Sequence, residues 1–208
     1  MRSSIVELDF GRCALVSLSD DELADALATL HDDERAAASQ LGPRRRREHV
    51  AGRVAMRILL PDAPPIGVTD RGGPVLPDGW VGSISHKPAL AAALVAPAGA
   101  GHVGVDLEVA AARPIDVSPR ILTPREQAAL PDRGAAVTLR FAIKEAIYKA
   151  VDPFVRRYVG FTEVELDVGD DGSCVVTIVD PARLPVAVEA RWQAWQGFWL
   201  ATARALRT

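Results

Sequence analysis

Two carboxylates placed two residues apart are the first feature of the sequence that could do chemistry. They are Asp106 and Glu108 in the segment HVGVDLE, residues 102–108. The segment reads as a strand, in which both carboxylates share one face with Gly104 while the alternating apolar residues face the other way. Neighbouring carboxylates repel unless a cation lies between them or both face water. Mg²⁺ suits such a pair, since it favours oxygen ligands and needs few carboxylates; a solvated edge strand is the alternative.

A second group of reactive side chains lies in RFAIKEAIYKA, residues 140–150. It holds Lys144 and Lys149, two of only three lysines in a chain whose other basic side chains are Arg. Lysine is a compact point charge that can follow a phosphate, whereas Arg imposes a planar fork. We interpret this segment as one that handles a pyrophosphate. The alternative is that Glu145 and Lys149, four residues apart, form only a helix-stabilising ion pair of about 0.3–0.5 kcal/mol.

The same segment has the period of a helix with two unequal sides. One side is an apolar stripe for the core, made of Leu139, Ile143, Ala146, Ile147 and Ala150. The other side mixes aromatic and charged residues, namely Phe141, Lys144, Glu145 and Tyr148, with Lys149 on its flank. Because an ordinary surface helix does not carry this mixture, we predict that the helix lines a cleft.

An arginine-rich helix is predicted upstream, in RRRREHVAGRVAMR, residues 44–57. Arg46, Arg53 and Arg57 fall on one helical stripe there, which could grip an anionic ligand. Most basic runs are simply solvated. The chain has a net charge of -3 and a pI of 5.8, so a few phosphates fit this stripe better than a nucleic acid does.

Hydroxyl and imidazole donors meet in GSISH. Ser83 and Ser85 share one face of a predicted strand, and His86 ends it where a loop opens. A lone His is most often structural. The nucleophile elbow G-x-S-x-G is absent, so a serine hydrolase is a poor interpretation, whereas a phosphate monoester would suit these donors.

The elements that must position these groups form two clusters of strands around a central helix. Strands are predicted at 13–18, 81–85, 90–96 and 101–109, and four more in the tail, the last two joined as a hairpin through Gln196 and Gly197. Helices are predicted between residues 19 and 41, over 44–60, from Thr123 with a capping box in TPRE, and over 136–151 after a break at PDRG. This pattern predicts an α+β architecture in two halves.

Composition excludes several classes of protein. Hydrophobic residues make up 49% and charged residues 25%, which is typical of globular proteins. We expect no membrane span, because the apolar runs are broken by Pro and Gly, and no secretory signal, which favours the cytoplasm. Cys13 and Cys174 lack the spacing of a zinc site and are expected to be free thiols.

The motifs GSISH, GVDLE and FAIKEAIYK, preceded by the arginine-rich helix and DRGGPVLP, together resemble the 4'-phosphopantetheinyl transferases of the Sfp type, the enterobactin-synthetase-like group. The resemblance runs from about Arg44 to Leu166. It implies two similar α/β halves related by a pseudo-twofold, with the active site in the cleft between them. Residues 1–100 would bind the phosphates and adenine of coenzyme A, and residues 101–208 would hold the metal and the catalytic helix. Phe141 stands where relatives often have Trp.

The resemblance also implies a reaction and roles for single residues. The enzyme would transfer the 4'-phosphopantetheine of coenzyme A to a serine of an acyl or peptidyl carrier protein of polyketide or nonribosomal peptide synthases, with Mg²⁺, and release 3',5'-ADP. A monomer is expected. The implied metal ligands are Asp106, Glu108 and Glu145. Glu145 is the favoured general base, with Glu108 or a metal-bound water as alternatives, and Lys149 completes the catalytic set. The implied contacts to coenzyme A are Arg45, Arg53, Arg71, Ser85, His86, Lys144 and Lys149.

Two other functions remain open at this point. One is another Mg²⁺-dependent phosphoryl or nucleotidyl enzyme that uses the same carboxylates without a carrier protein. The other is a non-enzymatic coenzyme A or nucleic-acid binding module, in which Glu145 and Lys149 form only an ion pair.

Overall fold

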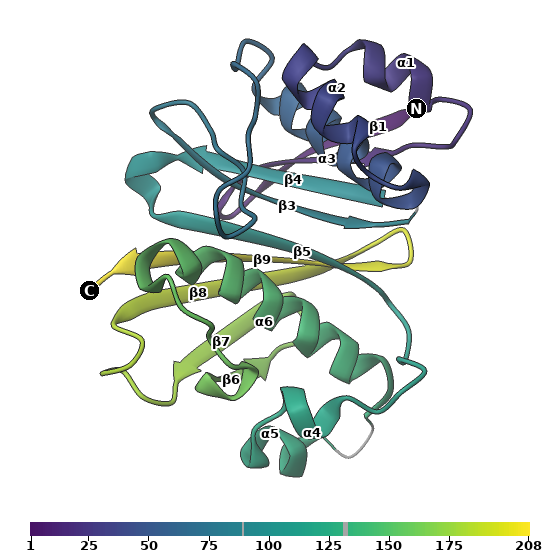
Figure 1. The fold of residues 1–208 in the computed structure, drawn as a ribbon. Helices are drawn as coiled ribbons and strands as arrows, with labels where there is room; N and C mark the ends of the chain where they lie inside the picture. The colour runs from purple at the N-terminus through teal and green to yellow at the C-terminus, as the bar shows by residue number, and fades with distance from the viewer. Residues whose placement is uncertain (89, 131–132) are drawn as a thin grey trace. The chain divides into compact units, whose positions relative to one another are not determined.

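The structure is a computed structural model of the chain and describes residues 1–88, 90–130 and 133–208. The chain divides into two units, Met1–Ala100 and Gly101–Thr208. Each unit has its own antiparallel sheet, with one long helix packed on it (Figure 1). The mixture of helices and antiparallel strands confirms the predicted α+β class.

The sheet of the first unit has four strands in the order β1-β2-β4-β3. The strands are β1 (Arg2–Leu8), β2 (Gly11–Ser17), β3 (Trp80–Lys87) and β4 (Leu90–Pro97). The helices are α1 (Leu23–Ala28), α2 (Asp32–Ser39) and α3 (Pro43–Leu59), and a 3-10 turn η1 (Ala98–Ala100) ends the unit. The edge strand β1 was not among the predicted strands.

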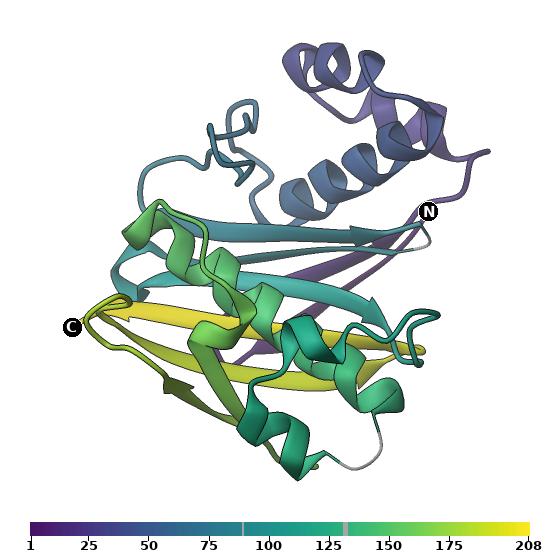
Figure 2. The same ribbon diagram turned by 60° about the horizontal axis from the view of Figure 1, so that its bottom comes forward.

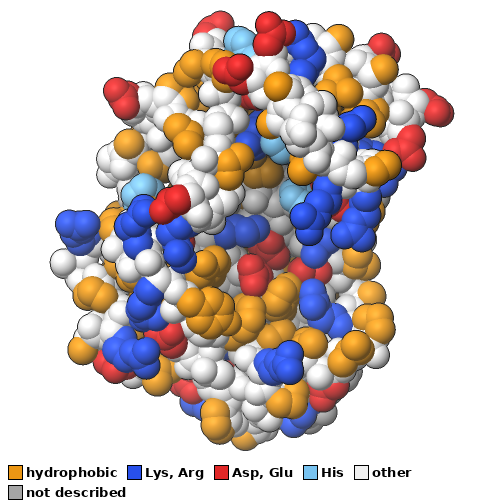
Figure 3. All heavy atoms as spheres, in the orientation of Figure 1, with side chains coloured by type: hydrophobic (Ala, Val, Ile, Leu, Met, Phe, Trp, Pro, Cys, Tyr) orange, Lys and Arg blue, Asp and Glu red, His pale blue; other side chains and the backbone are white. Residues whose placement is uncertain are grey.

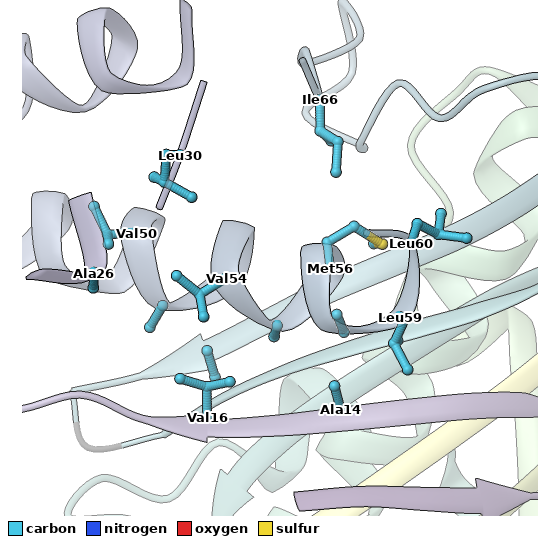
Figure 4. Packing of buried hydrophobic residues seen from close by; sticks show 14 of the residues in the cluster. Ala14, Val16, Ala26, Leu30, Val50, Val54, Met56, Leu59, Leu60 and Ile66 are labelled. Atoms are coloured by element: carbon cyan, nitrogen blue, oxygen red, sulfur yellow. The ribbon is translucent and has the colours of Figure 1, made fainter. Parts of the chain in front are cut away.

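The core of the first unit lies between α3 and one face of this sheet. Figure 4 shows Val50 and Val54 of α3 above Val16 of β2. Alternate residues of β2 and β4 face the helix, since Ala14 and Val16 belong to the same cluster as Ala91, Ala93 and Val95. Because the side chains of β4 are small, α3 packs closely on the sheet. This packing determines which residues of α3 face away from the sheet.

The sheet of the second unit has five antiparallel strands in the order β5-β9-β8-β7-β6. They are β5 (His102–Val109), β6 (Val164–Val168), β7 (Ser173–Ile178), β8 (Val186–Trp195) and β9 (Phe198–Arg207). The predicted hairpin joins β8 to β9. Its two turn residues, Gln196 and Gly197, both have positive φ, of 46° and 84°, as a type I′ turn requires.

The long helix α6 (Gly134–Val155) crosses one face of this sheet, as Figures 1 and 2 show from two directions. Its predicted apolar stripe is confirmed, because all five residues are buried in one cluster with alternate residues of β8 and β9. Gly104 of β5 permits the close approach: a Cβ there would overlap the carbonyl oxygen of Ala146 and lie 2.9 Å from the amide nitrogen of Ala150. Residues on this face of β5 are therefore brought directly under α6.

The short helices α4 (Ser118–Ile121) and α5 (Pro124–Ala129) and the 3-10 turn η2 (Phe161–Glu163) complete the second unit. The predicted capping box is confirmed: the Thr123 side chain accepts from the Glu126 amide, and the Glu126 carboxylate accepts from the Thr123 amide at 2.8 Å. The break predicted at PDRG includes Pro131 and Asp132, which lie outside the described residues.

Both cysteines are free and buried, and burial raises the pKa of each thiol to about 12. The prediction of free thiols is confirmed, and neither thiol is an available nucleophile. No helix in the described part of the chain is both long and apolar enough to cross a bilayer.

Candidate active site

The paired carboxylates of β5 lie on the face of the sheet that α6 covers. Asp106 and Glu108 are each only 6% exposed. The ammonium of Lys149 reaches down from α6, with Nζ 2.7 Å from Asp106 Oδ1 and 2.9 Å from the Val105 carbonyl oxygen. The structure therefore brings together three of the four predicted catalytic residues around one patch of β5, through the strand alternation and the helix register that the sequence predicts.

The second carboxylate, Glu108, has an arginine partner that the sequence analysis missed. Arg113 Nη2 donates to Glu108 Oε1 at 3.0 Å, and the guanidinium carbon of Arg113 lies 4.1 Å from the centroid of the Phe141 ring on α6. Each carboxylate of the pair thus contacts a basic side chain, which offsets the repulsion expected between neighbouring acids. The spacing of five residues between Glu108 and Arg113, within one turn-forming segment, is the signal that could have found this contact.

Glu145, the fourth predicted residue, is half-buried on α6, one helical turn before Lys149. The ammonium of Lys149 pairs with Asp106 of the neighbouring strand. A simple intrahelical ion pair with Glu145 would not require this contact.

Lys144 lies on a different side of α6 from Lys149, in a buried polar cluster. Its side chain is 1% exposed, and its ammonium donates to Glu126 Oε2 at 2.6 Å. It donates as well to the carbonyl oxygens of Ile121, Phe161 and Val164, at 2.8, 2.9 and 3.1 Å. Burial lowers the pKa of Lys144, and the hydrogen bond and charge of Glu126 offset part of that effect.

This placement argues against the predicted phosphate contact of Lys144. An ammonium has three donors, and all of them are directed at protein acceptors that would lose their partner if the side chain turned away. Lys144 instead ties α6 to the end of α4, to α5 and to the start of β6. We therefore leave it out of the proposed phosphate-binding set.

Three side-chain nitrogens of α3 are buried without hydrogen-bond partners, namely Nε of Arg47, Nε2 of His49 and Nε of Arg53. Arg53 is 6% exposed, and its Nη2 donates to the Gly67 carbonyl oxygen at 3.2 Å. Burial, followed by the nearby charge of Arg53, lowers the pKa of His49 to about 4. Buried donors without partners are costly, so His49 and Arg53 are suited to an anion that would accept from them.

The other predicted contacts to coenzyme A lie in the same unit. Ser85 is buried in β3, and His86 beside it is exposed, with Nδ1 3.4 Å from Oε2 of the buried Glu48 on α3. Arg45 is exposed near the start of α3, and Arg71 is exposed in the turn that Thr69 and Gly73 close. Ser85 and His86 are therefore positioned by the sheet and by α3, whereas Arg45 and Arg71 are surface side chains.

The predicted arginine stripe of α3 is only partly available to a ligand. Arg46 donates to the carbonyl oxygens of Ala38 and Ser39, and Arg57 pairs with the buried Glu34 at 2.8 Å and donates to the Ala63 carbonyl oxygen. These two arginines hold α2 and the segment after α3 in place. Arg53 lies between them in the sequence, and its Nε has no hydrogen-bond partner.

A hard divalent cation fits the donor set of β5 by its chemistry. Two carboxylates on one strand face supply the oxygen ligands that Mg²⁺ prefers, with substrate oxygens and water left to fill its octahedron. Across residues 1–88, 90–130 and 133–208, no three acidic, His or Cys side chains converge into a preformed metal cluster. In this structure Lys149 and Arg113 each contact one of these carboxylates. Figure 3 shows acidic side chains beside Lys and Arg side chains, next to hydrophobic ones, on the face of the second unit that carries α6.

Fold and site thus define an α+β protein with paired acids and a lysine on one patch, and anion donors on a separate helix. Comparison with known families agrees. Residues 33–96 match the family model of the 4'-phosphopantetheinyl transferase N-terminal domain, and residues 102–203 match that of the 4'-phosphopantetheinyl transferase superfamily.

Individual relatives give the same result. The 4'-phosphopantetheinyl transferase Npt of Nocardia iowensis is 34% identical over 157 residues, which are 69% of this chain and 68% of the relative. The 4'-phosphopantetheinyl transferase Svp of Streptomyces mobaraensis is 32% identical over 190 residues, 85% of this chain and 76% of its own. Enterobactin synthase component D of Salmonella typhi is 35% identical over 130 residues, 58% of this chain and 52% of its own. The chain belongs to the 4'-phosphopantetheinyl transferase superfamily, which confirms the resemblance seen in the sequence.

Proposed function

We propose that the protein transfers the 4'-phosphopantetheine group of coenzyme A to a serine of an acyl or peptidyl carrier protein and releases 3',5'-ADP. The observation that carries the proposal is the contact between Lys149 of α6 and Asp106 of β5, beside Glu108. It places a lysine ammonium next to two buried acids, inside the segment that matches the superfamily model. This combination suits a reaction in which a pyrophosphate is both bound and cleaved.

The cation-binding part of the proposal assigns Asp106, Glu108 and Glu145 to Mg²⁺. When bound, Mg²⁺ supplies positive charge to the pyrophosphate oxygens and so stabilises the charge of the leaving group. The donor chemistry of β5 supports the assignment of Asp106 and Glu108, whereas Glu145 is assigned by the resemblance alone.

The protein's own residues divide the remaining work. The Lys149 ammonium has three N–H donors. Two of them donate to the Val105 carbonyl oxygen and to Asp106, so the third is available to a phosphate oxygen. Glu145 is the favoured acceptor for the proton of the attacking serine hydroxyl. A carboxylate that binds a metal directly is a weaker base, so Glu108 or a metal-bound water is the alternative acceptor.

The first unit supplies donors for the 3'-phosphate of coenzyme A in this proposal. Arg53 brings a buried guanidinium with an unpartnered Nε, and Ser85 and His86 lie in the adjacent part of β3. Arg45 and Arg71, which are exposed, would add contacts from flexible side chains. An anion in place of the missing partners would relieve the cost of burying Arg53 Nε.

The proposal is tested by following both products of one reaction. The protein is incubated with coenzyme A, Mg²⁺ and an apo acyl or apo peptidyl carrier protein, and 3',5'-ADP is quantified by chromatography while the carrier is weighed by mass spectrometry. The two products should form in equal amounts, and only when the carrier serine is present. Release of 3',5'-ADP without carrier, or turnover of nucleotides without coenzyme A, would instead favour a general phosphoryl or nucleotidyl enzyme.

A further inference from the structure

Arg113, in the loop after β5, joins the proposed metal carboxylate Glu108 to an aromatic ring of α6. The guanidinium both donates to Glu108 at 3.0 Å and lies over the Phe141 ring at 4.1 Å. The Glu108 side chain is 8% exposed and the Arg113 side chain 29%, so their contact is partly shielded from water. A shielded ion pair is stronger than one at an open surface, so this pair competes with other ligands of Glu108.

Each carboxylate of β5 has a basic side chain against it in this structure. Lys149 matches Asp106, and Arg113 matches Glu108. A divalent cation bound to both carboxylates would bring two positive charges close to the ammonium of Lys149 and the guanidinium of Arg113. Because like charges at this spacing repel, one of the two basic side chains would have to leave its carboxylate when the metal binds.

Of the two basic side chains, Arg113 can leave its carboxylate more easily than Lys149 can. Lys149 belongs to the long helix α6 and also donates to the Val105 carbonyl oxygen at 2.9 Å, independently of Asp106. Arg113 belongs to a loop, and its Nε is buried without a hydrogen-bond partner. A buried donor without a partner costs about 1–3 kcal/mol, so the position of Arg113 depends on Glu108 and on the Phe141 ring.

We propose that Arg113 is a built-in counter-ion, which occupies Glu108 while no metal is bound and yields it to the divalent cation. Its presence lowers the affinity of the site for that cation, and the Phe141 ring keeps the guanidinium beside the site in both states. Arg113 is a positioning residue, since it acts through Glu108. The inference rests on the proposed function, because it takes Asp106 and Glu108 as the residues that bind the cation.

The test measures metal affinity directly, with Mn²⁺ as the probe and without coenzyme A or carrier protein. Free Mn²⁺ is quantified by electron paramagnetic resonance during titration of the wild type and of Arg113→Gln, Arg113→Lys and Arg125→Gln. Arg125 is the matched control, since it pairs with Glu165 and Asp167 in the same unit, at 2.9 and 3.0 Å. We expect Arg113→Gln to bind Mn²⁺ about tenfold more tightly, and the other two variants to bind it as the wild type does.

A second variant keeps the test decisive if Arg113→Gln is poorly folded. Phe141→Leu changes no charge but removes the ring under the guanidinium, and it should tighten Mn²⁺ binding by about threefold. Equal or weaker binding by both Arg113→Gln and Phe141→Leu would overturn the counter-ion role. If the wild type binds Mn²⁺ and transfers phosphopantetheine, that result leaves the proposed function standing. If the wild type binds no Mn²⁺, the counter-ion role and the metal site fail together.

Discussion

The ammonium of Lys149 lies 2.7 Å from Asp106 Oδ1, so a helix cation is fixed directly above a strand acid. Lys144, five residues earlier on the same helix, is instead enclosed by Glu126 and three carbonyl oxygens. Two lysines of one helix therefore have different tasks, one at the candidate site and one in the frame that supports it. This difference makes them controls for each other.

Replacing Lys149 should impair the reaction much more than the fold. In Lys149→Met, Asp106 loses its cation and the pyrophosphate loses a donor, so we expect kcat/KM for transfer to fall by about 10²- to 10³-fold. The free energy of unfolding should fall by about 1–3 kcal/mol, because the buried Asp106 loses a partner while Lys149 itself is partly exposed. Steady-state transfer assays and urea unfolding measure the two effects. An unchanged kcat/KM would remove Lys149 from the site.

Replacing Lys144 should have the opposite profile. Lys144→Met leaves Glu126 buried without its cation, which should destabilise the protein by about 3–5 kcal/mol. The double variant Lys144→Met/Glu126→Gln should recover part of this loss. It removes the uncompensated charge, and the side-chain oxygen of Gln can still accept a hydrogen bond from a backbone amide. Urea unfolding of the two single variants and the double variant gives the coupling energy. Loss of coenzyme A affinity in fully folded Lys144→Met would restore the phosphate contact that we have set aside.

The close approach of α6 to β5 predicts a strong effect of one methyl group. In Gly104→Ala the new Cβ meets backbone atoms of Ala146 and Ala150, which cannot move as a side chain would. We expect a loss of about 2–3 kcal/mol of stability, and reduced transfer, because Asp106 shifts relative to Lys149. Gly99→Ala is the matched control, since nothing lies within 4 Å of its Cβ position, and it should unfold as the wild type does. Equal stability of the two variants would show that the helix does not need this contact.

His49 predicts a component of acid sensitivity. Its pKa is lowered from 6.5 to about 4 in the folded protein, chiefly by burial, so the unfolded chain binds the proton more readily. Stability should therefore fall as pH drops from about 6.5 towards 4, and the part due to His49 should be about 1 kcal/mol at pH 5.5. His49→Gln does not titrate, and its unfolding free energy should lose less between pH 7.5 and 5.5 than that of the wild type. Parallel losses in the two proteins would contradict this assignment.

Much of the candidate site could be predicted because it depends on local periodicity. The alternation in HVGVDLE places Asp106 and Glu108 on one face, and the stripe of α6 sets which side chains of that helix lie away from the core. The capping box at Thr123 and the turn at Gln196 and Gly197 are likewise local patterns, and all were confirmed.

The contacts that the sequence analysis missed depend on which elements fold over one another. Glu126 is 18 residues from Lys144, and only the folding of α4, α5 and β6 around α6 turns that lysine into a buried ion. Arg113 contacts Phe141 because the loop after β5 lies against α6 in the folded chain. The edge strand β1 was missed because most of its side chains are exposed, so it carries little apolar signal.

The most direct measurement of the central claim is the intact mass of an apo carrier protein after incubation with this protein, coenzyme A and Mg²⁺. The wild type should add one phosphopantetheine to the carrier, and Glu145→Gln or EDTA should abolish the gain, while Arg125→Gln should preserve it. A carrier that stays unmodified across acyl and peptidyl types, despite tight binding of coenzyme A, would contradict the proposed transfer and favour a binding module.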